Sequence, residues 1–281
     1  MTPDPKEFLY VSDLDGTLLA PGGTFSQEAA GRLNRMIERG LNFTIATARN
    51  YDSAYPLLRL LNLKIPAILF NGVYLTEFQT GRNVHISGFL SQGIAADLIS
   101  MGEASGLDPF VYTYNHRHRV YYRKAANPGA QNYLDEQGRD RLQYVPQYDR
   151  VKVEDVSGLL FIDTHAELEP LCQVMKEKYP SELNLYFAED ISMRGHYWLQ
   201  IFNRNANKGI MLRRLAEHVS VPLSKTVVFG DYLNDLEMFA VAGRAVAVAN
   251  AMPQVRRAAH QVIGGNDTYA VLDYLESLGF D

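Results

Sequence analysis

The chain has 281 residues, which is long enough for a large hydrophobic core and for two domains. Its hydrophobic fraction of 47% and charged fraction of 21% are those of an ordinary globular protein. Its net charge of −5 argues against a nucleic-acid-binding protein, because such proteins usually carry an excess of basic residues.

The first 84 residues alternate strand-like and helical patterns. Apolar runs predict strands at 8–11, 41–46 and 67–70, and amphipathic patterns predict helices at 26–39 and around 57–61. Ser26 is expected to cap the first helix and Gly40 to end it. Asn71-Gly72 fits a tight hairpin turn before a short strand at 73–75. This alternation is typical of a doubly wound parallel sheet.

The pattern changes between His85 and Phe202, where strands come in pairs. Strand-like runs lie at 109–114, 120–123, 158–162, 183–187 and 197–202, and helical patterns lie at 91–105, 127–137 and 166–178. Two helix–strand–strand groups of this kind predict a separate antiparallel α+β domain.

The βα alternation returns after Asn207. The expected elements are a helix at 208–218, a strand at 225–229, a helix at 234–241, a strand at 245–248, and helices near Pro253 and Thr268. We therefore predict an α/β protein whose doubly wound, Rossmann-like core comprises residues 1–84 and 203–281. Residues 85–202 are expected to form an inserted α+β domain.

Two carboxylates follow the first predicted strand directly. Asp13 and Asp15 come after the apolar run 8–11, and Gly16 turns the chain at once, so both carboxylates gather at the carboxyl end of the strand. Ligands bind at this edge in open α/β sheets. Like charges this close raise one pKa unless a cation lies between them. Either a divalent metal neutralises the pair, or one carboxyl stays protonated as an acid; isolated Asp residues can also simply shape a turn.

The string Asp13-Leu-Asp-Gly-Thr-Leu-Leu19 resembles the first motif of the haloacid dehalogenase superfamily, whose members are mostly phosphohydrolases. Three later features match the other sequence motifs (here called stations) that this resemblance implies. Thr47 follows the second predicted strand, Lys208 begins a helix, and Gly230-Asp231-Tyr-Leu-Asn234-Asp235 follows another apolar strand. Where the family usually has Thr-Gly-Arg, this chain has Ala48 between Thr47 and Arg49.

The insert between Thr47 and Lys208 resembles the subclass IIB cap of Cof-type phosphatases. One departure lies near the end of the chain, where residues 265–270 lack the Gly that Cof-type members often have before their last helix. The resemblance implies that the cap closes over the substrate as a lid.

Each downstream station also has a structural explanation. Thr47 could cap the next helix, and Asp231 could cap the helix that follows it while Asp235 favours its first turn. An arbitrary Lys is usually solvated. Lys208, however, lies at a helix N-terminus, where a cation is unfavourable by up to about 1 kcal/mol. A bound anion would reverse that sign, so the position indicates a phosphate site.

The resemblance implies a magnesium-dependent phosphatase that hydrolyses a small phosphorylated metabolite, such as a sugar phosphate. Asp13 would attack phosphorus and form an aspartyl-phosphate, and Asp15 would act as general acid and base. Mg²⁺ would be held by Asp13, Asp231 and the backbone carbonyl of Asp15. The remaining roles are phosphate binding by Thr47, Lys208, Asn234 and Arg49, and support by Asp235 and Gly16.

Two other functions share these features. A phosphomutase would use every station and return the phosphoryl group to the sugar, and a non-catalytic regulatory module would bind a phosphometabolite without turnover. The basic run 116–119 with Arg123 and Lys124 could bind a second acidic group, although a solvated turn is the simpler interpretation. Aromatic side chains in the insert could stack on a substrate ring, but aromatics in strands are mostly core: Tyr121, Tyr122, Tyr197 and Trp198.

The single cysteine, Cys172, allows no intramolecular disulfide, which suits a reducing compartment. No apolar run approaches the roughly 18 residues of a membrane span, and the first residues do not resemble a signal peptide. We therefore expect a cytoplasmic protein that contacts no membrane, and the sequence implies no protein partner.

Overall fold

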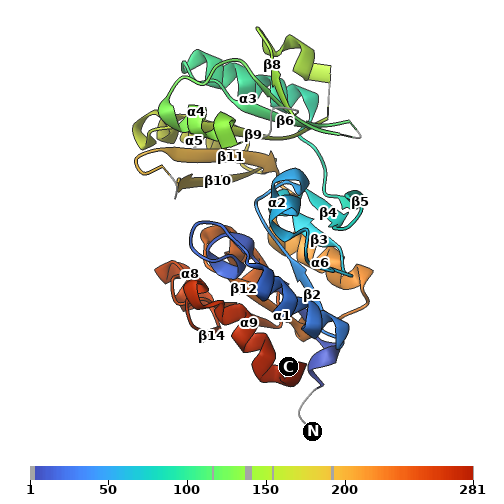
Figure 1. Cartoon of the computed structure of the whole chain (residues 1–281). Helices are drawn as coiled ribbons and strands as arrows, with labels where there is room; N and C mark the ends of the chain where they lie inside the picture. The colour runs from blue at the N-terminus through green and yellow to red at the C-terminus, as the bar shows by residue number, and fades with distance from the viewer. Residues whose placement is uncertain (1–3, 116, 137–140, 154, 191–192, 281) are drawn as a thin grey trace. The chain divides into compact units, whose positions relative to one another are not determined.

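The computed structural model describes residues 4–280 except 116, 137–140, 154 and 191–192. The chain divides into two compact units, which we call the core unit (Met1–Ser87 with Ala206–Asp281) and the cap unit (Gly88–Asn205) (Figure 1). The sequence placed the two boundaries at 84/85 and 202/203. Within the described residues, no helix is both long and apolar enough to cross a membrane.

The core unit is built on a five-stranded parallel sheet with the strand order β14-β13-β12-β1-β2. The strands are β1 (Leu9–Ser12), β2 (Asn42–Ile45), β12 (Thr226–Gly230), β13 (Arg244–Ala247) and β14 (Gln261–Val262). Every residue of β1 and β12 is buried, as expected for central strands of a sheet covered on both faces. The predicted doubly wound parallel sheet is therefore confirmed.

The helices of the core unit are α1 (Gln27–Glu38), α2 (Tyr51–Leu58), α6 (Lys208–His218), α7 (Leu236–Phe239), α8 (Pro253–Ala258) and α9 (Ala270–Leu275). Ser26 caps α1 as predicted, because its Oγ accepts from the amide of Ala29 at 3.1 Å. Figure 1 shows α1 beside α9, and Arg32 of α1 donates to Asp273 of α9 at 2.6 Å. The helix expected through Leu61 ends at Leu58.

A small antiparallel sheet completes this unit: β3 (Ala67–Leu69), β4 (Tyr74–Glu77) and β5 (Arg82–Ile86). The apolar run 67–70 is predicted to belong to the parallel sheet; β3 lies beside the end of β2 and is joined to it by a parallel bridge between Ala46 and Ile68, while its longer pairing is antiparallel, with β4. The predicted hairpin at Asn71-Gly72 is present, but it is less tight than a two-residue turn, since its last pair is Leu69 with Tyr74 and four residues connect the strands.

Among the described residues, the cap unit has a six-stranded sheet with the order β10-β11-β9-β6-β7-β8 and three α-helices. The strands are β6 (Phe110–Tyr114), β7 (His118–Tyr122), β8 (Leu142–Tyr144), β9 (Val156–Asp163), β10 (Leu183–Glu189) and β11 (Tyr197–Asn203). The helices are α3 (Gln92–Ala104), α4 (Pro128–Glu136) and α5 (His165–Lys178). Strand β8 was not predicted, and it pairs parallel with β7, whereas the other pairs are antiparallel. Gln137, the last residue of a predicted helix, lies outside the described residues.

The two faces of the cap sheet bury different residues. One face packs on α3 and α5, in a core that includes Val111, Leu159, Leu98 and Cys172. The neighbouring residue on β6, Phe110, points to the other face, where its ring lies 4.5 Å from that of Tyr133 on α4.

Candidate active site

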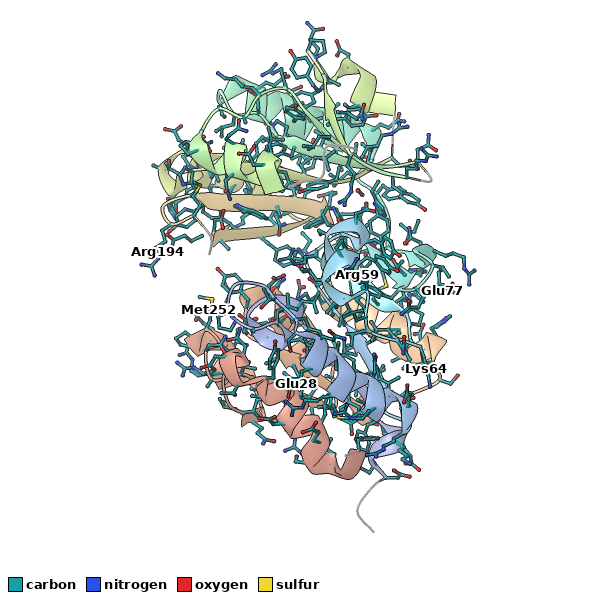
Figure 2. The ribbon with its side chains drawn as sticks, in the orientation of Figure 1. Glu28, Arg59, Lys64, Glu77, Arg194 and Met252 are labelled. Atoms are coloured by element: carbon teal, nitrogen blue, oxygen red, sulfur yellow. The ribbon has the colours of Figure 1, made fainter. Side chains whose placement is uncertain are left out.

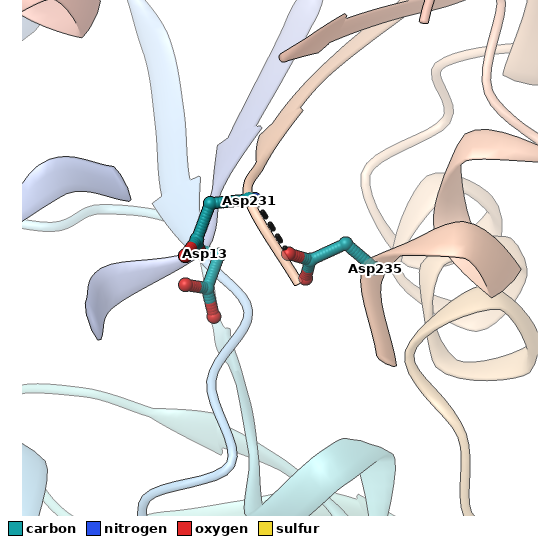
Figure 3. A group of neighbouring side chains, drawn as sticks. All are labelled: Asp13, Asp231 and Asp235. Atoms are coloured by element: carbon teal, nitrogen blue, oxygen red, sulfur yellow. Dashed lines mark hydrogen bonds between the residues drawn. The ribbon is translucent and has the colours of Figure 1, made fainter. Parts of the chain in front are cut away.

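Two acidic residues stand at the carboxyl ends of adjacent parallel strands. Asp13 follows β1, and its amide donates to the carbonyl of Phe229 in β12 at 3.0 Å. Asp231 follows β12, and Asp235 comes from the turn after it. Figure 3 shows the three carboxylates together, and one ligand oxygen from each lies within 4.8 Å of the others. All three side chains are buried. The parallel pairing of β1 with β12 brings Asp13 of the first predicted motif next to Asp231 of the fourth.

The turn after Asp13 fits closely against Asp231. Residues Leu14–Leu18 form a single turn closed by the amide of Leu19 on the carbonyl of Leu14 at 2.9 Å. Gly16 has φ +78, and a Cβ there would lie 2.3 Å from Oδ2 of Asp231. Thr17 donates its hydroxyl to Oδ1 of Asp231 at 2.8 Å. Gly16 is therefore required by the backbone and by the approach of Asp231, and Thr17 is a site residue to which the sequence had given no role.

Lys208 is fully buried at the first position of α6, whose N-cap, Asn207, accepts from the amide of Ile210 at 2.7 Å. The solvated-lysine interpretation is therefore wrong. The Nζ atom donates to Oδ1 of Asp13 at 2.6 Å and to Oδ1 of Asp235 at 2.7 Å. Two carboxylates of the chain thus balance the cation that the helix N-terminus disfavours.

Asp235 has both carboxylate oxygens engaged. Oδ1 accepts from Lys208, and Oδ2 accepts from the amides of Asp231 at 2.9 Å and Tyr232 at 3.0 Å. The first of these amide bonds is the dashed line in Figure 3. In contrast, Asp13 accepts from Lys208 and Asp231 accepts from Thr17, each through Oδ1, and the carboxyl groups of Asp13 and Asp231 also contact each other. Both oxygens of Asp235 are bonded to the chain, so Asp235 supports the site, and the adjacent pair of Asp13 and Asp231 is the better candidate to hold a cation.

Burial and neighbouring charges shift the pKa values of the groups in this cluster. Burial raises the pKa of Asp13 well above its usual range; Lys208 opposes this shift, and the carboxylates of Asp235 and Asp231 add to it. Burial, with the charge of Asp235, raises the pKa of Asp231 to about 7. Burial also disfavours the charged Lys208, but Asp13 and Asp235 outweigh it and raise the pKa of its ammonium group.

The donor set fits a hard divalent cation. The group Asp13, Asp231 and Asp235 offers carboxylate oxygens alone, without His or Cys, which suits Mg²⁺ better than Zn²⁺.

Thr47 and Arg49 lie in the loop after β2. Thr47 is buried, and its Oγ1 accepts from the amide of Arg49 at 3.0 Å. It does not cap α2, since Asn50 does so by accepting from the amide of Ser53. Arg49 makes a two-point pair with Asp15: Nε to Oδ2 and Nη2 to Oδ1, each at 2.8 Å. The sequence predicts that Arg49 binds the phosphate, and it does not predict this pair with Asp15.

Asn234 lies in the turn Leu233–Asp235, which precedes the short helix α7. Its Nδ2 donates to Oδ1 of Asn71 at 2.9 Å. The sequence predicts only a turn at Asn71, and it does not predict this contact between residues far apart in the chain.

The other candidates, in the cap unit, have structural partners. Arg123 pairs with Asp108 and Glu103 rather than standing in an open basic patch, and His116 of the same run lies outside the described residues. The four aromatic residues pack within the unit: Tyr121 and Tyr197 against the helix-covered core, Tyr122 against Phe110, and Trp198 against Tyr133.

Comparison with known proteins places this chain in a family. A family model described as haloacid dehalogenase-like hydrolase matches residues 10–275. An HMP-PP phosphatase of Serratia proteamaculans is 27% identical over 95% of this chain and 94% of its own length. The 5-amino-6-(5-phospho-D-ribitylamino)uracil phosphatase YitU of Bacillus subtilis is 26% identical over 97% and 98%. A haloacid dehalogenase-like hydrolase from Bacteroides thetaiotaomicron has the same fold, with a TM-score of 0.81 at 21% identity over 96% of this chain and 99% of that one.

Proposed function

This chain belongs to the haloacid dehalogenase-like hydrolases, and we propose that it is a magnesium-dependent phosphatase of a small phosphorylated metabolite. As a phosphoric monoester hydrolase, it needs a nucleophile and an acid–base group at one place. The observation that carries the proposal is the buried Asp13 carboxylate, held by Lys208 beside Asp231. The two relatives described above are named as phosphatases of different compounds, which supports the reaction class more strongly than any one substrate.

In the first step, a carboxylate oxygen of Asp13 forms a bond to phosphorus as the bond to the leaving oxygen breaks. The product is an aspartyl-phosphate and a free alcohol. The ammonium of Lys208 keeps the nucleophile oriented, since it fixes one oxygen of Asp13 at 2.6 Å. Asp15 donates the proton that the leaving oxygen needs. For this step, Asp15 leaves its ion pair with Arg49 and contacts the leaving oxygen of the substrate. The side chain of Asp15 is 40% exposed, so this change does not bury a charge.

In the second step, Asp15 takes a proton from a water molecule, whose oxygen attacks phosphorus. The bond between phosphorus and Asp13 breaks, inorganic phosphate leaves, and the carboxylate of Asp13 is restored. Asp15 thus acts first as an acid and then as a base.

Asp13, Asp231 and the backbone carbonyl of Asp15 would hold Mg²⁺, which, when bound, offsets the repulsion between the nucleophile and the phosphoryl group. The close approach of the carboxyl groups of Asp13 and Asp231 supports this assignment. Thr17 orients Asp231, and Asp235 orients Lys208 and the turn that carries Asp231.

We assign the phosphoryl oxygens to Thr47, Lys208 and Asn234. The Oγ1 of Thr47 accepts from the chain, so its hydroxyl hydrogen can be donated to an anion. Asn234 uses one amide hydrogen on Asn71 and has a second to donate. Arg49 is near enough to Asp15 to assist the same anion once that pair opens.

The proposed substrate is a small phosphomonoester, such as a sugar phosphate, and the proposed location is the cytoplasm, where the buried thiol of Cys172 would stay reduced. A phosphomutase remains the second candidate because it would need the same residues. Phosphorus NMR separates the two, since a mutase yields an isomeric phosphate ester and no inorganic phosphate.

The proposal is tested with p-nitrophenyl phosphate and Mg²⁺. The wild type should release phosphate, EDTA should stop the release, and Asp13→Asn should abolish it. Glu28→Gln is the matched control, because Glu28 is exposed on α1 (Figure 2). Activity in Asp13→Asn comparable to that of the control would refute Asp13 as the nucleophile; thermal unfolding of both variants checks that they are folded.

A further inference from the structure

Three successive residues at the tip of the β3–β4 hairpin have left-handed backbone conformations. Phe70, Asn71 and Gly72 have φ values of +52, +50 and +86. Phe70 and Asn71 are also buried, with 3% and 0% exposure. Residues with side chains disfavour this region, and they are held there only when their surroundings fix them. Hairpin turns favour positive φ at an Asn-Gly pair, but they do not account for the left-handed Phe70 before it, so the surroundings of this turn must hold it.

The backbone of this turn is bonded to the loop that carries Thr47. The amide of Asn71 donates to the carbonyl of Thr47 at 3.0 Å, and the amide of Phe70 donates to the carbonyl of Arg49 at 2.9 Å. On its other side, the turn lies against the N-cap of α6: a Cβ on Gly72 would meet the carbonyl oxygen of Asn207 at 2.3 Å. The turn therefore fixes the spacing between the Thr47 loop and the start of the helix that carries Lys208.

The side chain of Asn71 adds a contact to the third phosphate-binding element. Its Oδ1 accepts from Nδ2 of Asn234 at 2.9 Å. A primary amide has two N–H groups in one plane. When Asn71 holds one of them, the direction of the other is fixed as well.

The residue type at position 71 is informative. Glycine adopts a left-handed backbone at the least cost and would serve the turn alone. Asparagine tolerates this region better than most residues, but it still costs more than glycine. Asn before Gly is also common in turns with positive φ, so the role of the carboxamide is indicated by its complete burial and by its bond to Asn234.

From these contacts we infer that Asn71 is a positioning residue for phosphate binding, acting through Asn234. This inference rests on the proposed function, in which Asn234 donates to a phosphoryl oxygen. By accepting one amide hydrogen of Asn234, Asn71 holds the second hydrogen toward that oxygen before the substrate arrives. Its backbone at the same time joins this amide to the loop of Thr47 and to the start of α6.

The test is Asn71→Gly, because glycine relieves the backbone conformation and removes only the carboxamide. We expect a Tm equal to or above that of the wild type. We also expect a KM for p-nitrophenyl phosphate, and a Kd for inorganic phosphate measured by calorimetry with Mg²⁺, that are about threefold to tenfold higher. Ser220→Gly is the matched control: Ser220 also has a left-handed backbone, at φ +57, but is exposed at the end of α6, so KM and Kd should not change.

A double-mutant cycle separates positioning from a general structural effect. In an Asn234→Ala background, Asn71→Gly should raise the phosphate Kd no further, because the group on which it acts is gone. An unchanged Kd in Asn71→Gly alone, or a full additional loss in the double variant, overturns the inference. A wild type that binds phosphate but hydrolyses no phosphomonoester refutes the proposed function alone, and the Kd values still decide the inference. A wild type that binds no phosphate in the presence of Mg²⁺ overturns both.

Discussion

Among the residues of the site, we expect replacement of Lys208 to lower the free energy of unfolding the most. It is 0% exposed, and its ammonium is bonded to two carboxylates that are also buried. In Lys208→Met, a side chain of similar length remains, but Asp13 and Asp235 lose their shared cation. Removing one partner of a buried ion pair costs about 3–5 kcal/mol, because it leaves uncompensated charge in a poorly solvated place. For a domain of this size class, that corresponds to a fall in Tm of about 6–20 °C.

The sign of the pH dependence follows from Asp13. Its pKa in the folded wild type is already raised, and loss of the ammonium raises it further, since Lys208 is the group that lowers it. Stability from a raised carboxyl pKa is present at low pH and is lost as the pH rises through that pKa. The deficit of Lys208→Met relative to the wild type should therefore be smaller at pH 6 than at pH 8.

Circular dichroism during thermal unfolding at both pH values measures these effects. The matched control is Lys225→Met, which removes a lysine whose ion pair with Glu7 is exposed, with side-chain exposures of 40% and 54%. Such pairs contribute about 0–1 kcal/mol, so this Tm should move by only a few degrees. If both variants lost the same small amount, or if the deficit of Lys208→Met grew at acidic pH, the account of a buried cation shared by two carboxylates would be wrong.

Two further predictions concern the metal. The pKa of Asp231 in the metal-free site is about 7, so the stability contributed by its protonated form is lost as the pH rises through 7; Mg²⁺ binds the ionised form. Saturating Mg²⁺ should therefore raise the Tm more at pH 8 than at pH 6 in scanning fluorimetry, and equal shifts would contradict this. Gly16→Ala should weaken Mg²⁺ binding at least tenfold in titration calorimetry, because the new Cβ displaces Asp231. Gly22→Ala has a comparable φ of +86 but nothing within 4 Å, so it should bind Mg²⁺ as the wild type does.

The sequence predicted those parts of the molecule that local patterns encode. Apolar runs that end in Asp13 and Asp231 marked the central strands, and parallel pairing of β1 with β12 then necessarily brought their ends together. The same reasoning placed β3 only in part: β3 is joined in parallel to the end of β2 by one bridge, but it pairs mainly with β4, and a short buried apolar run has the same composition in a parallel sheet and in a hairpin.

Contacts between distant polar side chains also lay beyond the sequence. Arg49 and Asp15 are 34 residues apart, and Asn71 and Asn234 are 163 apart. Each partner has an ordinary explanation by itself, as a turn residue or a surface charge. Only the fold decides that they face one another. The dipeptide Asn71-Gly72 did signal a turn with positive φ, but a turn signal carries no information about what its side chain contacts.

The charges of the cluster explain why two neighbouring aspartates can have different roles. When ionised, the carboxylates of Asp13, Asp231 and Asp235 with the ammonium of Lys208 give a net charge of −2, which one divalent cation balances. In the proposed mechanism, hydrogen-bond donors such as Thr47 and Asn234 would then stabilise the incoming phosphoryl group. Asp15 stands outside this balance, more exposed and paired with Arg49. In the proposed mechanism, the proton transfers of Asp15 therefore take place outside the buried cluster. Burial raises the pKa of Asp13, so Asp13 can serve as the nucleophile only where positive charge, that of Lys208 included, keeps its carboxylate ionised.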